Sequence, residues 1–566
     1  MPGQRVGADM GYRGSSDGSL VSSISDWVER HMAMAVLVVV ALGFVLRLVC
    51  ATKQYFNPDE ALHYLIANQA GLDQVYRASL TTAHPPLFFM LLYFWRFLGN
   101  SELVLRLISV LAGTAGLWVG FNWLAYRSGT TTGLVGLLLL AFNPTMISMS
   151  AEVRGYATLL LTMMLALYYL ERALREKSRW MLLWFGVAAL VANLIHYSAV
   201  WFTIAVGLYA LVRIVRERLP GRWVGAWVAI QAGIAALLIV LYLTHVRTIH
   251  GSGMERYARD GWLQEFYFHP GRDKVLPFLA RNLSWLFTYL FWSRVPGLVA
   301  LGLFLAGVVT LFVPYRRKPD TSTRNQDRRW VEDSSFGVLI VAAFVVNALA
   351  ALAGLYAFGY DRHDVFLGLF AVAGVSSLFG RMAGRRSGAV LLAFAVIVPM
   401  VKSTSASAVW DYKPEEQSRA AMGAAIRYIK DSIPRASILF VDCQTADLLG
   451  YYLGRDQIDS LTVVLQRDCE SKDQFPSHAS VSDEKFTELS YGGYRVFATP
   501  LCDFVPLDFC AELEAMKQRY GLGPTVPVWG VGWKSQHYSD SLLFDHAHAF
   551  LRYRAFDPSL SVFQVQ

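Results

Sequence analysis

Charge is what this sequence has least of. Only 17% of its 566 residues are Asp, Glu, Lys or Arg, against about 25% in a typical soluble domain. The chain is 54% hydrophobic and its mean hydropathy is +0.36, which excludes a disordered chain and argues against an ordinary soluble enzyme. The net charge is +8, but the basic residues form short clusters between apolar runs. This arrangement is typical of a polytopic membrane protein and not of a nucleic-acid-binding face.

Cysteine is also scarce, and no Cys-x-x-Cys spacing indicates a structural zinc site. Cys50 lies in an apolar run, and the other four cysteines, Cys443, Cys469, Cys502 and Cys510, lie in the last quarter of the chain. An even number in one polar domain indicates disulfides and an oxidising compartment. Four cysteines allow three pairings, and four reduced, buried thiols remain the alternative.

Apolar runs long enough, or nearly so, to cross a bilayer recur along the chain, and a span takes about 20 residues. They lie at 32–51, 102–125, 129–150, 156–171, 180–197, 198–215, 223–245, 295–314, 336–356, 365–381 and 389–403. Two shorter or interrupted runs, 85–98 and 275–292, could instead lie along the membrane surface. If both stay outside the membrane, every short basic cluster faces the cytoplasm, which the positive-inside rule favours. These clusters are 172–179, 213–222, 315–329 and 381–386.

The sequence therefore predicts a polytopic α-helical membrane protein of about 11–13 transmembrane helices, in the plasma or inner membrane. Residues 1–30 are expected to be a disordered cytoplasmic tail, 31–403 the transmembrane domain with a first outer loop at 52–101, and 404–566 an extracytoplasmic α/β domain. In that last domain we expect helices at 415–433 and 507–520, and strands at 437–441, 461–465, 494–498 and 526–531.

Polar residues accumulate at the predicted outer ends of the spans, where a charge is costly and usually serves a purpose. Asp59 and Glu60 follow Pro58 and open a helix. They are either an ordinary acidic first turn, which the helix dipole favours, or a general base or metal ligand. His84 precedes two prolines, which favours an extended backbone. It either marks the start of a helix or contacts an anionic head group.

Three more groups lie on the same predicted face. Candidate site residues are Arg106 in the second span, Glu152, Arg154 and Tyr156 after the third, and Tyr360, Arg362 and His363 after the 336–356 span. The alternatives are an Arg that snorkels, an interfacial Arg with a Tyr anchor, and an Asp361–Arg362 ion pair. A carboxylate can take the proton of an acceptor hydroxyl, and guanidinium groups bind phosphate bidentately. The combination indicates glycosyl transfer with a lipid phosphate as the leaving group.

Four motifs occur in order between residues 59 and 156, and the resemblance that they carry covers roughly residues 33–400. They are Asp59-Glu60, His84-Pro85-Pro86-Leu87, Glu102-Leu103-Val104-Leu105-Arg106-Leu107, and Asn143-Pro144 with Glu152–Tyr156. Together they resemble the GT-C fold glycosyltransferases that use polyprenyl-phosphate sugars. The branch most similar holds protein O-mannosyltransferases and lipid A aminoarabinose transferases.

The resemblance implies roles for individual residues. Asp59, with Glu60 as its neighbour, is expected to act as general base or to orient the acceptor. His84, Arg106, Arg154 and Arg362 are expected to hold the lipid phosphate. Some relatives have Lys at the position of His84, and several have Asp in the second outer loop where this chain has Glu152. No metal site or cofactor is assigned, although some relatives need a divalent cation, which Asp59, Glu60 and Glu152 could ligate through oxygen.

The function predicted is an inverting glycosyltransferase in the lipid bilayer, with Asp59 as base. Its partners would be a polyprenyl-phosphate sugar donor and an acceptor that is a protein, a lipid or a glycan on the extracytoplasmic face, with no nucleic acid. Two rivals remain. One is a transporter or flippase of lipid-linked sugars, which would need charges inside the spans. The other is a membrane scaffold with a secreted recognition domain.

Overall fold

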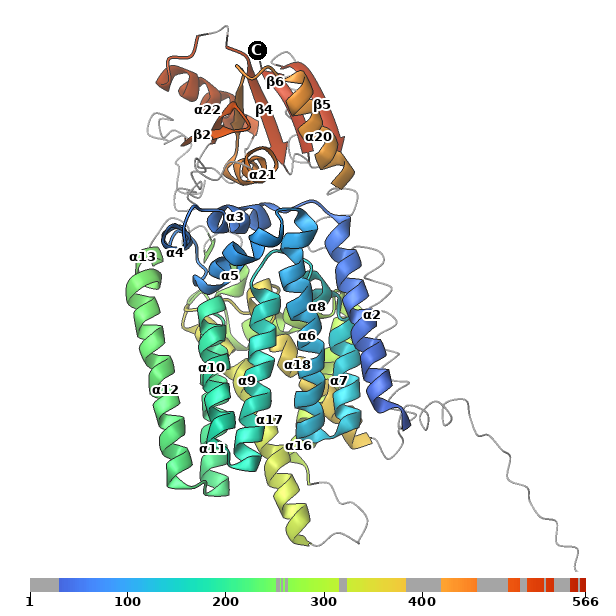
Figure 1. Ribbon diagram of the computed structural model, residues 1–566. Helices are drawn as coiled ribbons and strands as arrows, with labels where there is room; N and C mark the ends of the chain where they lie inside the picture. The colour runs from blue at the N-terminus through green and yellow to red at the C-terminus, as the bar shows by residue number, and fades with distance from the viewer. Residues whose placement is uncertain are drawn as a thin grey trace, which may run out of the picture.

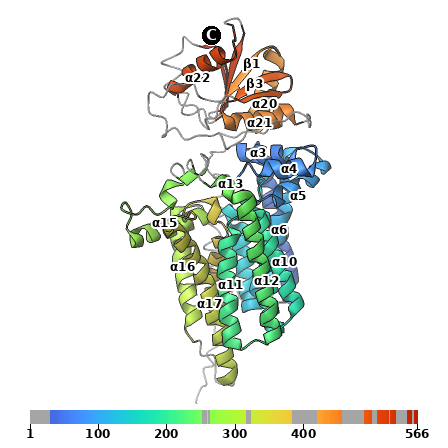
Figure 2. The same ribbon diagram turned by 90° about the vertical axis from the view of Figure 1, so that its left-hand side faces the viewer.

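The computed structural model is a bundle of long helices with a sheet-containing domain over one end (Figures 1 and 2). It describes residues 30–250, 255, 258–259, 263–314, 323–382, 419–455, 487–498, 506–523, 526–533, 550–557 and 560–565. The predicted tail at 1–30 and the predicted span at 389–403 lie outside these residues, except for Arg30.

Ten of the predicted spans are helices of the bundle. They are α2 (Met32–Lys53), α6 (Glu102–Ser128), α7 (Thr130–Phe142), α9 (Tyr156–Glu176), α10 (Arg179–Ile195), α11 (Ala199–Glu217), α12 (Gly221–Leu241), α16 (Arg294–Phe312), α17 (Thr323–Leu352) and α18 (Leu367–Met382). Seven of the described helices are long and apolar enough to cross a membrane, while α7, α10 and α18 are shorter. The predicted polytopic α-helical fold class is confirmed.

Small residues let the central helices approach closely. Gly116 and Gly120 lie one turn apart on the buried face of α6. A Cβ atom at either position would come within 2.7 Å of Met164 on α9 or Leu140 on α7. Without a hydrophobic drive between helices in lipid, such close packing is a main source of their attraction.

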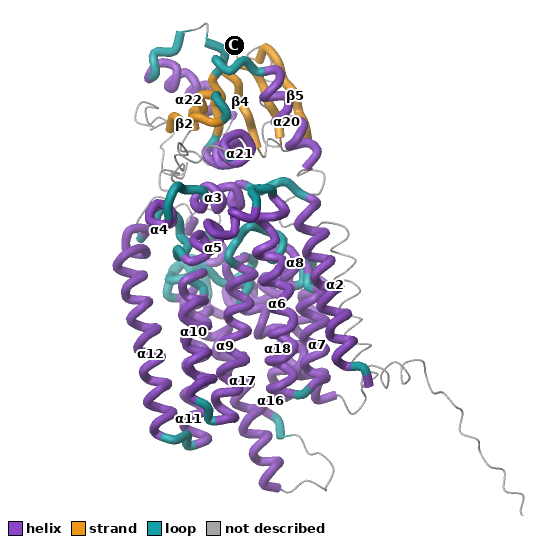
Figure 3. The backbone as a smooth tube through the Cα atoms, viewed as in Figure 1, coloured by secondary structure: helices purple, strands orange, loops and turns teal. Residues whose placement is uncertain are grey.

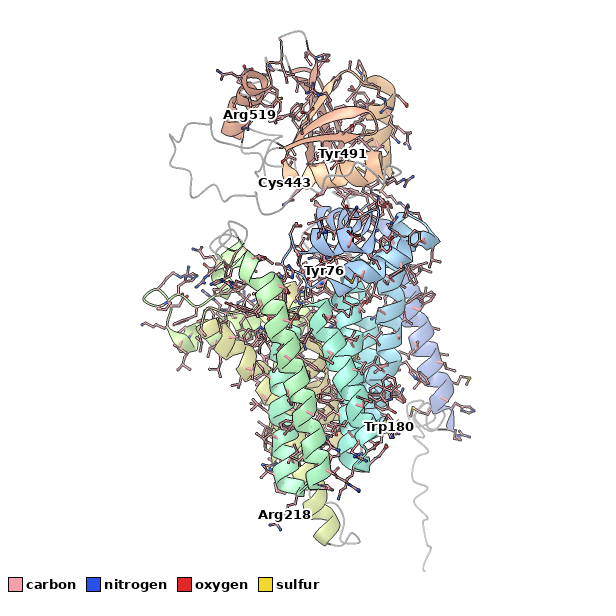
Figure 4. All side chains as sticks on the ribbon, turned by 60° about the vertical axis from the view of Figure 1, so that its left-hand side comes forward. Tyr76, Trp180, Arg218, Cys443, Tyr491 and Arg519 are labelled. Carbon is pink, nitrogen blue, oxygen red and sulfur yellow. The ribbon has the colours of Figure 1, made fainter. Side chains whose placement is uncertain are left out.

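Six helices other than these ten lie near the end of the bundle that faces the sheet domain (Figures 1, 2 and 3). They are α3 (Pro58–Ala67), α4 (Leu72–Ser79), α5 (Leu87–Trp95), α8 (Pro144–Met149), α13 (Arg247–Ile249) and α15 (Val275–Leu290). The two ambiguous apolar runs form α5 and α15, and α5 packs on α3, α4 and α10. The opposite end carries the basic loop with Arg218, far from Tyr76 of α4 (Figure 4).

The interior of the spans contains charged side chains. Arg47 of α2 is 1% exposed and donates to Ser150 Oγ and to the carbonyl oxygens of Gly43, Leu140 and Ala141 at 3.0–3.3 Å. These acceptors supply the polar contacts that make a buried guanidinium tolerable. No sequence spacing pointed to these contacts, because the acceptors outside α2 are two backbone carbonyls of α7 and the Ser150 hydroxyl, about 100 residues away.

The C-terminal region forms a mixed six-stranded sheet in the order β2-β3-β1-β4-β6-β5, with helices packed against it. Only β1 with β3 and β1 with β4 run parallel. The elements are α20 (Arg419–Ser432), β1 (Ile438–Val441), α21 (Cys443–Gly454), β2 (Thr487–Tyr491), β3 (Tyr494–Ala498), α22 (Pro506–Arg519), β4 (Val528–Trp533), β5 (Phe550–Asp557) and β6 (Leu560–Val565). The predicted C-terminal α/β architecture is confirmed.

The sequence interpretation missed α21, β2, β5 and β6, and the predicted strand at 461–465 lies outside the described residues. The β2–β3 hairpin turns at Gly492 and Gly493, whose φ angles of 56° and 83° suit glycine. Among the domain's cysteines, Cys443 is buried at the start of α21. Cys469 and Cys502 lie outside the described residues, so the predicted disulfides stay a prediction.

The C-terminal domain docks on the bundle through α21, which packs on α3. The Tyr451 hydroxyl donates to the Asn100 carbonyl at 2.9 Å, and the Tyr64 hydroxyl donates to the Arg455 carbonyl at 3.1 Å. The Tyr452 hydroxyl accepts from the Phe56 amide at 3.0 Å. The sheet domain therefore braces the segment that begins α3.

Candidate functional site

The first element of the site is the start of α3, where the expected helix begins as predicted. Pro58 occupies the first helical position, and Asn57 and Glu60 form a capping box. The Asn57 side chain accepts from the Glu60 amide at 2.9 Å, and the Glu60 carboxylate accepts from the Asn57 amide at 3.1 Å. This local chemistry fixes Asp59 and Glu60 in the first turn.

Glu60 points into the protein and binds Arg106. The Glu60 carboxylate accepts from Arg106 Nε at 2.8 Å and from Nη2 at 2.6 Å, and both side chains are 3% exposed or less. The remaining N–H groups of Arg106 donate to the carbonyls of Ala51, Gln54 and Tyr55 at 2.7–3.0 Å. All five guanidinium donors of Arg106 are thus taken by the protein, which leaves none for a lipid phosphate in this structure.

Asp59 points toward a pair of arginines instead. Its Oδ2 lies 2.5 Å from Arg154 Nη1 and 3.0 Å from Arg362 Nη2. Asp59 is 33% exposed and Arg362 28%, while Arg154 is 3% exposed. Burial alone would raise the pKa of Asp59, but Arg154 and Arg362 outweigh it and hold that pKa below its usual value.

Arg362 is presented by a short turn after α17. Asp364, fully buried, accepts from the Gly359 backbone amide at 2.7 Å and from Asn347 Nδ2 at 2.9 Å, and so shapes this turn. Asp361 pairs with His363, which leaves Arg362 to Asp59. The alternative of a local Asp361–Arg362 pair is therefore not what the structure shows.

Four imidazoles line up beside Asp59. The ring centroids are 5.3 Å apart from His63 to His84, 5.2 Å from His84 to His196 and 5.9 Å from His196 to His363. Burial lowers the pKa of His63 to about 3 and also lowers that of His84 well below its usual value. A lowered pKa favours the neutral imidazole at pH 7, and the expected contact of His84 with the lipid phosphate stays a prediction.

The remaining predicted residues lie around this centre. Glu152 lines a cavity of about 10 Å³ beside Glu60 and Arg106, and burial raises its pKa to about 7. The Arg154 guanidinium lies over the Tyr156 ring, with Cζ 5.2 Å from the ring centroid. Tyr360 is 42% exposed and packs edge-on against Tyr289 at the rim.

The fold therefore brings Asp59, Arg154 and Arg362 into direct contact and places the Glu60–Arg106 pair next to them. Sequence reasoning missed His63 and His196. His63 lies one turn after Asp59 on α3, and its Nδ1 donates to the Asp59 carbonyl at 2.7 Å. That four-residue spacing was a usable signal. His196 follows an apolar run and carried no signal that separates it from a helix end.

The part of the chain that the structure describes shows no set of ligands for the possible divalent cation. There, no group of three His, Cys, Asp or Glu side chains is arranged to hold a metal ion. The carboxylates of Asp59 and Glu60 are both engaged with arginines.

The architecture and site define the class of molecule: a polytopic membrane protein whose polar, partly exposed centre lies at one end of the bundle. The family model described as dolichyl-phosphate-mannose-protein mannosyltransferase matches residues 83–243. No curated protein matches the chain.

Two solved structures share the fold over most of both chains. One is ArnT from Cupriavidus metallidurans bound to undecaprenyl phosphate, with 12% identity, coverage of 94% of this chain and 97% of that one, and a TM-score of 0.52. The other is the Archaeoglobus fulgidus oligosaccharyltransferase in complex with Zn and sulfate, with 11% identity, coverage of 94% and 88%, and a TM-score of 0.50. The chain therefore has the GT-C fold, and the resemblance seen in its motifs is confirmed at that level.

Proposed function

We propose that this protein is a membrane glycosyltransferase that takes its sugar from a polyprenyl-phosphate donor. The proposal rests on the position of Asp59, a partly exposed carboxylate that lies between Arg154 and Arg362 at the end of the bundle. A base and two phosphate-binding groups in one place suit the transfer of a sugar away from a phosphate. The family model match at 83–243 and the ArnT structure bound to undecaprenyl phosphate support the same donor class.

In the proposed reaction the arginines change partners. A lipid phosphate would draw Arg154 and Arg362 toward its oxygens, which lowers the positive field on Asp59 and raises its basicity. Asp59 then takes the proton of the acceptor group, whose heteroatom bonds to the anomeric carbon. The bond from that carbon to the phosphate oxygen breaks, and its electron pair leaves with the lipid phosphate. A single in-line displacement of this kind inverts the anomeric carbon.

Arg106 and Glu60 take a supporting part in this proposal. Their buried pair ties the start of α3 to the end of α2, and Glu60 Oε1 also accepts from the Val153 amide at 2.9 Å. Glu60 therefore links α3 to the loop that carries Arg154. We propose that Glu60 and Arg106 position Asp59 and Arg154 and do not touch the donor.

Basic residues clustered at the short turns of one end of the bundle support an extracytoplasmic site. The exposed residues Lys177 and Arg179 lie at the turn between α9 and α10, and Arg218 and Arg222 lie at the turn between α11 and α12, at the end of the bundle away from α3 (Figures 1 and 4). The positive-inside rule assigns such an end to the cytoplasm. The acceptor would then be met on the other face, where the C-terminal domain lies.

The rival function, transport of lipid-linked sugars, requires charges in the spans that are available to a substrate. The buried charges found there are engaged with the protein: Arg47 with backbone carbonyls, and Glu171 with Arg127 and Arg213. We therefore retain the transferase proposal.

The test is mass spectrometry of the full-length protein in mild detergent, incubated with a polar-lipid extract of its host. Wild type and Asp59→Asn are run in parallel. We expect both to bind a polyprenyl phosphate, and the sugar-loaded lipid to be consumed only by wild type. The proposal is wrong if neither protein binds such a lipid, or if the two consume the loaded lipid equally.

A further inference from the structure

A second cavity, separate from the one beside Glu152, lies between α3, α5, α9 and the end of α10. Its volume is about 10 Å³, and His63, His84, Arg154, Tyr156 and His196 line it together with apolar side chains. That volume has room for about one water-sized oxygen group.

Three polar atoms of these lining residues lack a partner. The Tyr156 hydroxyl, Arg154 Nε and His196 Nε2 are buried and meet no hydrogen-bonding group among the residues that the structure describes. Tyr156, Arg154 and His196 are 1%, 2% and 4% exposed. Buried donors left unsatisfied are costly and rare, so three around one cavity indicate a missing acceptor.

The hydrogen bonds of the two histidines define which ring nitrogen carries the proton. The Ser198 amide donates to His196 Nδ1 at 3.1 Å, so this nitrogen has no proton and the neutral ring carries it on Nε2. In His63 the order is reversed, because Nδ1 donates to the Asp59 carbonyl at 2.7 Å. The Nε2 atom of His63 is then an acceptor.

The residues that line the cavity thus hold unsatisfied donors on Tyr156, His196 and Arg154 and an acceptor on His63. A hydroxyl group both accepts and donates, fits the volume and carries no charge, whereas a phosphate group is several times larger. Arg154 joins the cavity to the reaction centre, because its Nη1 holds Asp59 at 2.5 Å.

We propose that this cavity binds one hydroxyl group of the sugar on the lipid donor and so contributes to the choice of sugar. The inference rests on the proposed function. Tyr156 and His196 would be specificity residues that contact the sugar, while Asp59 and Arg362 act at the acceptor and the phosphate.

The test measures the affinity of the full-length protein for two kinds of probe. One is bare undecaprenyl phosphate, and the other is its mannosyl, glucosyl or 4-amino-4-deoxyarabinosyl ester, whichever wild type binds most tightly. We expect Tyr156→Phe and His196→Ala each to weaken ester binding about tenfold, the effect of one lost hydrogen bond. Binding of the bare lipid should stay within about twofold, and His196→Gln, which keeps a donor, should recover most of the loss.

The matched control is Tyr126→Phe, which removes a hydroxyl that donates to Glu176 at the other end of the bundle. It should bind both probes as wild type does. The inference is overturned if wild type gains no affinity from any sugar, if the two site variants bind the ester as wild type does, or if they lose both probes equally. Failure of wild type to bind the bare lipid would overturn the proposed function itself, and the sugar site with it.

Discussion

Both ends of the helical bundle hold a carboxylate between two arginines, and they differ in exposure. At one end Asp59 lies 2.5 and 3.0 Å from Arg154 and Arg362 and is 33% exposed. At the other, Glu171 lies 3.8 Å from Arg127 and 3.5 Å from Arg213 and is 1% exposed. The same three charges therefore occur once in reach of a ligand and once sealed within the protein.

The difference shows that burial, not residue type, distinguishes a ligand-binding carboxylate from one that only stabilises the fold. Around Glu171 the protein supplies further partners: the Tyr209 hydroxyl donates to it at 2.5 Å and accepts from Arg213 at 2.6 Å. Removing one member of a buried ion cluster leaves an uncompensated charge. A half-exposed carboxylate can release its arginines to another anion, because water and the ligand replace it.

The largest effect is expected from Asp59→Asn, which should affect activity far more than stability. Loss of a general base should lower the rate of sugar transfer by about 1000-fold, while the free energy of unfolding falls by only about 1 kcal/mol because the pair is partly exposed. Initial rates with a saturating lipid donor and chemical denaturation in detergent check the two values. A variant that keeps more than a tenth of the wild-type rate would remove Asp59 from the chemistry.

The matched change at the other end is Glu171→Gln. We expect it to lower the free energy of unfolding by about 3 kcal/mol, since it removes the buried carboxylate that Arg127 and Arg213 share and leaves them only Asp333 and Glu217 as carboxylate partners among the described residues. The transfer rate per folded molecule should stay at the wild-type value. Denaturation curves and activity normalised to folded protein separate these effects, and a stable but inactive protein would contradict the assignment of Glu171 as a brace.

A smaller effect is expected from Arg362→Gln. Loss of one charge-assisted contact to phosphate should weaken the binding of undecaprenyl phosphate by about 30-fold. Arg172→Gln, which removes an exposed pair with Glu176 at the far end, is the control and should bind normally. Equal affinities in all three proteins would show that Arg362 serves only to hold Asp59.

The smallest effect concerns pH and Glu152. Burial raises the pKa of this carboxyl to about 7, above its value of about 4.3 in the unfolded chain. The folded state therefore binds more protons between these values, and stability falls as pH rises from about 4.3 to about 7. Compared with Glu152→Gln, wild type should lose about 2 °C of its thermal midpoint across this window. If the thermal midpoints of the two proteins changed equally with pH, the raised pKa of Glu152 would be contradicted.

Part of the site was predictable because its chemistry is local. Asn57, Pro58 and Glu60 specify the start of α3 through a capping box, so the first turn that carries Asp59 is readable from adjacent residues. Arg106 shows how far local sequence can predict the site. Its motif identifies it as a candidate residue but not its partners, because Glu60 and the three backbone carbonyls that it contacts lie about 50 positions earlier in the chain.

The histidines and the sheet domain show the same limit. His196 enters the site only because α10 ends beside α9 and the His84 segment that precedes α5. The strands β5 and β6 pair at the edge of the sheet with register shifts in β5, which blur the alternation on which a strand prediction depends.

By itself the sequence determined that this chain is a helical membrane protein, where most spans lie, and that polar groups gather at one end of them. Hydropathy and helix-start chemistry act over neighbouring residues, and a bilayer span is a matter of length and composition. Only the tertiary structure decided that Arg154 and Arg362 pair with Asp59 while Arg106 pairs with Glu60. The strength of an ion pair depends on the distance between the charges and on their burial. Both quantities are set by how the helices pack, so local sequence patterns do not predict them.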